Sequence, residues 1–126
     1  MDNIQQGKNQ SIYKVALASS DGKTIDRHYG KADTFYIFEI DENDGYNLIE
    51  TRTVTPACMG GSHDAVLMEK SSVRFSDCRY VVAVRIGAGA AAALAKNGIA
   101  AMELPGSFDD AIAKLWKYNR IQNLFR

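Results

Sequence analysis

Residues 19–30 read S-S-D-G-K-T-I-D-R-H-Y-G and lie between two apolar stretches, residues 12–18 and 35–40. Both flanking stretches have the apolar composition of strands. A hairpin can reverse the chain with two residues, so a connection of about a dozen residues is long for that task. Gly22 and Gly30 are predicted to supply backbone turns that a side chain would resist. Because long ordered loops are often functional, we expect this segment to carry part of the site.

The composition is that of an ordinary soluble globular protein. Of the 126 residues, 46% are hydrophobic and 24% are charged. A chain of this length can bury a core without disulfide or metal staples. Lysine plus arginine equals aspartate plus glutamate at 15 each, so no net field attracts nucleic acid or an anionic membrane. We therefore expect neither nucleic acid nor membrane as a partner.

The N-terminal segment is polar and lacks the apolar core of a signal peptide. Residues 1–11 are predicted to be a flexible tail, and residues 12–126 a single domain. The longest apolar run, Ala88–Ala95, is too short and too rich in glycine to span a bilayer. These features predict a cytoplasmic protein. In that reducing compartment Cys58 and Cys78 are expected to be free thiols.

Periodicity and turn residues predict the element order β-β-β-α-β-α-β-α. Asp41–Gly45 is a strong turn signal, so the strands on either side of it should form an antiparallel hairpin. Ser62 and Ser107 are expected to cap helices, and Gly98 suits the end of one. The predicted strands are Ile12–Ala18, Phe35–Ile40, Tyr46–Val54, Tyr80–Val84 and Ile99–Leu104, and the predicted helices are His63–Phe75, Ala90–Asn97 and Phe108–Tyr118.

This order predicts an α/β fold with a mixed sheet covered by helices. If the first two strands pair antiparallel, the first, third and fourth strands end at the same edge. Ligands bind such sheets beyond the carboxyl ends of the parallel strands. Three loops should therefore meet there, namely Ser19–Gly30, Thr55–His63 and Arg85–Gly89.

His28 is the first candidate ligand, because imidazole binds borderline metals such as iron and also carries protons near neutral pH. Asp26 and Ser20 are placed to orient it, as carboxylates commonly fix a ligating imidazole. The alternative is structural. His28 then hydrogen-bonds its own loop, and Asp26 satisfies backbone amides in the turn.

Cys58 and His63 form a second candidate pair, in C-M-G-G-S-H. A thiolate and an imidazole on a glycine-rich loop can reach one iron or zinc ion, but a structural zinc site needs four ligands in two close pairs. Such an incomplete site suits a ligand that arrives already assembled. The alternative is an adaptable surface loop with an incidental cysteine. Cys78 is expected to be buried as a small apolar residue at the other end of its strand.

The turn I-G-A-G at residues 86–89 joins a strand to a helix N-terminus, whose free amides attract anions. Gly87 and Gly89 are therefore candidate binding residues, together with Ser19. Arg85 adds a positive charge, or alternatively pairs with a nearby carboxylate. Nucleotide binding is weakly supported, because the glycine pattern is only partial and a P-loop lysine is absent. Neither a catalytic triad nor a close acid pair is found, so we expect no enzyme activity.

Two segments carry a family resemblance. Residues 15–39 read V-A-L-A-S-S-D-G-K-T-I-D-R-H-Y-G-K-A-D-T-F-Y-I-F-E, and residues 83–99 read A-V-R-I-G-A-G-A-A-A-A-L-A-K-N-G-I. This combination resembles the dinitrogenase iron-molybdenum cofactor family, which includes NifX-like and NafY-like carriers and the C-terminal domain of NifB. The resemblance covers roughly Tyr13–Tyr118. Its most specific part is the serine-rich turn followed by Asp-x-His-aromatic-Gly.

The resemblance implies a ribonuclease-H-like three-layer α/β/α fold with a five-stranded mixed sheet of order 3-2-1-4-5. It also implies binding of the iron-molybdenum cofactor, or of its iron-sulfur precursor cluster, for delivery during nitrogenase assembly. The matching motif carries the ligand role to His28; Cys58 and His63 lie in a loop that varies in the family. The implied partners are nitrogenase assembly proteins or apo-dinitrogenase, and the chain is expected to be a monomer or weak dimer.

Two other functions compete with that of a carrier. One is a regulatory or adaptor protein that binds a nitrogenase component or an assembly protein through residues 116–125 without holding a cluster. The other is a phosphoryl-transfer hydrolase on the same scaffold. The hydrolase is disfavoured because two-metal catalysis needs several clustered carboxylates, and only Asp21 and Asp26 approach the predicted edge.

Overall fold

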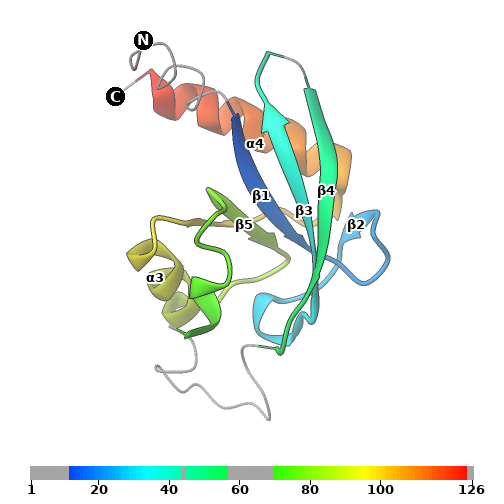
Figure 1. Ribbon diagram of the computed structural model, residues 1–126, viewed down its shortest axis with the longest axis vertical. Helices are drawn as coiled ribbons and strands as arrows, with labels where there is room; N and C mark the ends of the chain where they lie inside the picture. Colours follow the sequence, from blue (N-terminus) through cyan, green and yellow to red (C-terminus); the bar gives the residue numbers. More distant parts are fainter. Residues whose placement is uncertain (1–11, 44, 57–69, 125–126) are drawn as a thin grey trace.

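The structure is a computed structural model and describes residues 12–43, 45–56 and 70–124 (Figure 1). Four of the predictions fall wholly or partly outside these ranges. They are the N-terminal tail, the Cys58 and His63 pair, the Ser62 cap, and most of the helix expected at His63–Phe75. The described end of that helix is helical over residues 70–73 and turns over residues 74–77.

Five strands form one mixed sheet in the order β4-β3-β1-β5-β6. Counted along the chain, these are the third, second, first, fourth and fifth strands of this sheet. β1 pairs antiparallel with β3 and parallel with β5, and the β3–β4 and β5–β6 pairs are antiparallel and parallel. The predicted mixed sheet and hairpin are therefore confirmed. The bounds are β1 Ile12–Ala18, β3 Thr34–Asp41, β4 Gly45–Thr53, β5 Tyr80–Ala83 and β6 Ala100–Glu103.

β1 is the centre of the sheet because its residues can be buried on both faces. Residues 15–18 of this strand, V-A-L-A, are fully buried. β-Branched and small apolar residues without alternation are what a strand covered by helices requires. Val15 and Leu17 face one core cluster, and Ala16 and Ala18 face the other.

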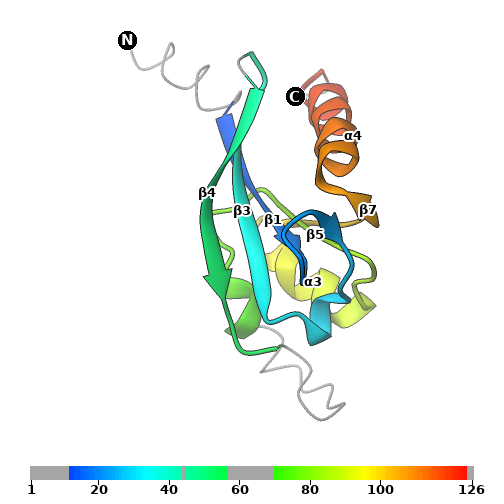
Figure 2. The ribbon, with the colours of Figure 1, turned by 90° about the vertical axis from the view of Figure 1, so that its right-hand side faces the viewer.

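Two helices cover opposite faces of this sheet. α3 (Ala88–Lys96) contributes Ala90, Ala93 and Leu94 to the cluster on one face. α4 (Phe108–Asn123) contributes its buried residues to the cluster on the other face. Figures 1 and 2 show that α4 lies beside the hairpin end of β3 and β4, whereas α3 lies toward the opposite end. No helix in the described ranges is long and apolar enough to cross a membrane.

The 19–30 segment contains two short elements that periodicity does not predict. β2 (Thr24–Ile25) pairs antiparallel with β7 (Gly106–Ser107), and η1 (Tyr29–Lys31) is a single 3-10 turn. Gly30 lies inside η1, so the prediction that it supplies a special turn is wrong. A two-residue strand is too short to show alternation. Its pairing depends on the approach of two distant segments, which local sequence does not encode.

α4 begins where predicted and ends later. The Ser107 hydroxyl accepts a hydrogen bond from the Asp110 amide at 3.1 Å, so this residue caps the helix as expected. Asp109 and Asp110 in the first turn favour the positive end of the helix dipole. The helix continues to Asn123 because Leu115 and Asn119 beyond its middle remain buried.

Replacing the capping serine should weaken the domain without changing its fold. Ser107→Ala leaves the Asp110 amide without its acceptor and is expected to lower the free energy of unfolding by about 1 kcal/mol. Urea titration followed by circular dichroism measures the loss. The exposed Ser76, changed to alanine, is the control and should stay close to the parent. Equal stability of Ser107→Ala and the parent would show that the hydroxyl does not stabilise the helix.

Candidate functional site

Two loops at the carboxyl end of β1 and β5 are joined by backbone hydrogen bonds. The Val84 amide donates to the Arg27 carbonyl and the Tyr29 amide donates to the Arg85 carbonyl, both at 2.9 Å. His28 lies between these two points of attachment. The predicted meeting of the 19–30 and 85–89 loops is therefore confirmed.

Tyr29 anchors the segment that carries His28. Its ring is only 2% exposed and packs against Phe35 and Phe75, with ring centroids 6.0 and 6.4 Å away. Phe35 and Phe75 contact each other at 4.6 Å between centroids. Burial of three aromatic rings stabilises the loop by hydrophobic transfer and by edge-to-face contact. Because Tyr29 turns into the core, the adjacent His28 is left exposed on the surface.

His28 borders a shallow hollow of about 280 Å³ that is also lined by Asp26, Arg27 and Lys31. The Arg27 guanidinium donates to the Lys31 carbonyl at 3.3 Å, which holds one wall of the hollow. Two cations and one carboxylate therefore surround the imidazole. Sequence reasoning missed Arg27 and Lys31, although both stand within three residues of the histidine.

The Asp26 carboxylate accepts hydrogen bonds within its own loop. It accepts from the Ser20 amide at 2.9 Å and from the Ser20 hydroxyl. Both oxygens are thus engaged by one residue, which matches the structural alternative for Asp26. The pair closes the loop across six positions and holds the chain that leads to His28.

Ser19 and Asp21 form the start of the same loop. Ser19 is 1% exposed, and its hydroxyl donates to Asp21 and accepts from the Asp21 and Gly22 amides. Gly22 has φ +75°, and a Cβ there would lie 3.1 Å from the Tyr36 ring, so this position requires glycine. The Asp21 carboxylate accepts from the Thr24 and Lys23 amides and the Thr24 hydroxyl. These bonds hold the pKa of Asp21 far below its usual range.

The turn between β5 and α3 and the first residues of α3 contain two exposed glycines. Gly87 is the N-cap of α3 and has no side-chain cap, and a Cβ at Gly87 or Gly89 would meet nothing within 4 Å. Arg85 is exposed beside it. The Ile86 amide donates to Glu103 Oε2 at 2.7 Å, which ties the turn to the end of β6. Glu103 was not predicted, since a carboxylate after a short strand carries no distinctive sequence signal.

The third predicted loop is described only at its start and beyond its end. The Val54 amide donates to the Asp33 carbonyl at 2.8 Å, so the chain leaves β4 beside the residues that follow η1. Arg74, beyond the loop, donates to the Thr55 carbonyl at 2.8 Å. Cys58 and His63 lie outside the described residues. Within the described ranges no three His, Cys, Asp or Glu side chains group as a metal site.

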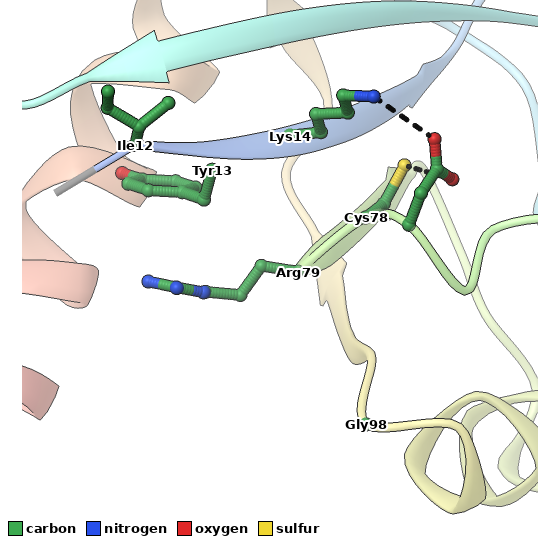
Figure 3. A pocket seen from close by; sticks show the side chains of 7 residues that line it. Ile12, Tyr13, Lys14, Cys78, Arg79 and Gly98 are labelled. Atoms are coloured by element: carbon green, nitrogen blue, oxygen red, sulfur yellow. Dashed lines mark hydrogen bonds and ion pairs between the residues drawn. The ribbon is translucent and has the colours of Figure 1, made fainter. Parts of the chain in front are cut away.

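Cys78 lies at the opposite end of β5 from His28, as predicted. It is buried, and its thiol donates to Asp77 Oδ1 at 3.6 Å beside Lys14 (Figure 3). The Asp77 carboxylate lies 3.5 Å from the Lys14 ammonium and also accepts from Arg52. Burial, with the Asp77 charge as a smaller cause, raises the pKa of Cys78 to about 12. This cysteine is therefore a core residue and no thiolate ligand.

The fold and site together define a small mixed α/β domain with an exposed histidine where two loops are joined. The sequence matches the family model described as "Dinitrogenase iron-molybdenum cofactor" over residues 11–118. The chain therefore belongs to this family, as its motifs indicate. The family is one of iron-molybdenum cofactor biosynthesis, in agreement with the names of its relatives.

Two curated relatives are FeMo cofactor biosynthesis proteins named NifB. The protein from Frankia alni is 32% identical over 108 residues, which is 82% of this chain and 21% of the relative. The protein from Chlorobaculum tepidum is 27% identical over 113 residues, which is 89% of this chain and 26% of the relative. The chain thus spans only about a fifth to a quarter of the length of these relatives.

A solved structure shares the fold. The NMR structure of a Thermotoga protein, assigned by its name to NifB, has a TM-score of 0.55 and 22% identity. The match covers 83% of this chain and 88% of that one. At this level of identity the likeness concerns the fold alone.

The pKa of Asp21 predicts how the stability of the loop depends on pH. Folding lowers this pKa below its ordinary value of 3.8, so the carboxylate stabilises the fold above that pH. The contribution is lost as the pH falls from 3.8 toward the folded-state pKa. Asp21→Asn should therefore be less stable than the parent at pH 7, and the difference should shrink below pH 3.8. Urea titrations at pH 7 and at pH values below 3.8 measure this difference in the free energy of unfolding. A constant difference would show that the charge of Asp21 is irrelevant.

Cys78 should resist thiol reagents in the folded protein. In a Cys58→Ser variant, which leaves Cys78 as the single cysteine, a maleimide at pH 8 should react only after denaturant is added. The reason is burial together with a pKa of about 12, which leaves almost no thiolate. Mass spectrometry over time follows the adduct. Fast labelling without denaturant would mean that the thiol is accessible.

Proposed function

We propose that this chain is a non-enzymatic carrier of the iron-molybdenum cofactor or of its iron-sulfur precursor cluster during nitrogenase cofactor assembly. The single observation that carries the proposal is the exposed His28 held at two points between the 19–30 and 85–89 loops. Family membership supplies the class of cargo.

The charge around His28 supports an anionic cargo. Arg27 and Lys31 line the same hollow, and Arg85 lies on the neighbouring loop. A cluster with net negative charge would be attracted to this rim, while the imidazole binds one iron atom. Asp26 also lines the hollow, but its oxygens accept hydrogen bonds from Ser20.

The glycine turn adds donors for the same cargo. Gly87 and Gly89 at the start of α3 are exposed, and a Cβ at either position would meet nothing within 4 Å. Amides at a helix N-terminus stabilise negative charge. Cys58 and His63 are the further ligand candidates, from the loop that begins beside Asp33.

The openness of this site supports a carrier and not a catalyst. A hollow of about 280 Å³ that is shallow and exposed neither excludes water nor encloses a reacting group. A carrier has to release what it binds, so an accessible ligand is an advantage. We place this work in the cytoplasm, with assembly proteins or apo-dinitrogenase as receivers, on a scaffold of the ribonuclease-H-like type.

A regulatory or adaptor protein without cargo is the second candidate. The exposed apolar residues at the end of α4 favour it, because Ile121 and Leu124 face solvent. In that case the loop around His28 would have a structural role only. Cargo binding distinguishes the two functions.

Anaerobic gel filtration with isolated cofactor or precursor tests the carrier. Iron should co-elute with the parent protein, and His28→Ala should weaken binding by at least about tenfold, since even residues that only orient a metal ligand cost that much. Bound iron is counted in the protein fractions. Lys23→Ala, an exposed change in the same loop that does not line the hollow, is the matched control.

The outcomes separate the candidates. Unchanged co-elution of iron with His28→Ala would reject His28 as the main ligand. If the parent binds neither cluster, the carrier function is wrong and the adaptor function is favoured.

A further inference from the structure

β4 is an edge strand that carries exposed apolar side chains. Among the described strands it pairs with β3 alone. Tyr46, Leu48 and Ile49 on this strand are 42%, 49% and 42% exposed. A long apolar edge strand offers unpaired backbone groups to another chain, and proteins usually protect such edges.

A groove adjoins this edge at the hairpin end. It has a volume of about 520 Å³ and lies between the end of the β3–β4 hairpin and α4. Its apolar lining comes from Ile40, Ile112, Ala113 and Trp116. The Trp116 indole donates to the Glu42 carbonyl at 3.3 Å, so the helix and the hairpin are fixed relative to each other. The groove is thus built into the fold.

Tyr46 joins the groove to the edge strand. It lies on β4, lines the groove and donates its hydroxyl hydrogen bond to Asp109 on α4. This bond is the largest cause of the raised pKa of Tyr46, so the phenol stays protonated. Edge and groove therefore form one continuous surface, which we call the hairpin–helix surface. Its residues are Tyr46, Leu48 and Ile49 of β4 together with the lining of the groove.

The charged residues that line the groove are mostly acidic. Among the described residues that line the groove, Asp41, Glu42 and Asp109 are acidic and Lys117 is basic. The chain as a whole is neutral, so these acids are concentrated locally. Charge complementarity then calls for a cationic occupant.

We propose that the hairpin–helix surface binds an extended, basic and apolar segment of a partner protein, which adds a strand to β4. The backbone of the segment pairs with the free edge, as in other cases of strand addition. Its apolar side chains contact Tyr46 and Leu48, and a lysine or arginine reaches the acidic lining of the groove. Binding of this segment does not require the cargo of the proposed carrier function.

A second copy of this chain fits less well. Pairing of β4 with its own copy would bring the same three carboxylates of both chains to one contact. Like charges at an interface oppose association. Self-pairing through β4 is therefore treated as an outcome of the test.

The surface and His28 lie at opposite ends of the sheet. In the β1–β3 register, Ile12 is opposite Asp41 near the groove, and Ala18 is opposite Phe35 near the His28 loop. Figure 2 shows the hairpin end and η1 far apart along these strands. A partner on the hairpin–helix surface would leave His28 accessible.

Selection from a displayed library of random twelve-residue peptides on the intact protein tests the proposal. Enriched peptides should combine alternating apolar residues with lysine or arginine. Raising NaCl from about 0.1 M to about 1 M should weaken binding of a synthesised peptide, because salt screens the charge. Leu48→Ser and Ala113→Arg, which fills the groove with a cation, should each weaken it at least about fivefold, a change of about 1 kcal/mol.

Val73→Ser is the matched control, since Val73 is 54% exposed and lies outside this surface. It should bind the peptide as the parent does. The proposal is overturned if no peptide is enriched, if enriched peptides lack basic residues, or if binding survives both substitutions. It is also overturned if sedimentation shows a dimer that Leu48→Ser dissolves. None of these readouts involves iron, so failure here is distinct from failure of the carrier function.

Discussion

Burial of the Tyr29 ring is the constraint on which the candidate site depends. The ring packs against Phe35 from β3 and Phe75 from the turn before β5, so it links two parts of the chain. Backbone bonds to Val84 and Arg85 on either side of His28 complete the attachment. A histidine held in this way faces solvent. The position of its backbone is set by aromatic packing and by these two bonds, although the imidazole itself contributes nothing to the core.

The sheet places the other loops near this anchor. β1 and β5 run parallel, and β4 runs in the same direction because two antiparallel pairings separate it from β1. The carboxyl ends of β1, β4, β5 and β6 therefore share one edge. The β2–β7 pair and the hydrogen bond from the Ile86 amide to Glu103 fix the connections that follow these strands. Fixing a long loop costs conformational entropy, and these contacts between distant segments help to offset that cost.

Much of this arrangement follows from sequence. The apolar run of β1, the turn before β4 and the cap at Ser107 each have a local signal, so the strands of the sheet, the hairpin, α3 and α4 could be predicted within a few residues. The loop could not be predicted in detail. The exposure of His28 depends on where the Tyr29 ring packs, and the burial of Ser19 depends on its bonds to Asp21 and Gly22. The first of these facts arises from a contact between distant segments and the second from hydrogen bonds within one loop, and periodicity reveals neither.

The two ends of the sheet have opposite chemistry, and this suggests a division of labour. At the loop end, Arg27 and Lys31 line the same hollow as the exposed His28. At the hairpin end, three carboxylates border an apolar groove. Although the chain has no net charge, the two ends of the sheet carry local charges of opposite sign. A cargo protein benefits from this separation, because a receiver attracted to the acidic end does not compete electrostatically with an anionic cargo at the basic end. The rigid strands between them keep both surfaces available at the same time.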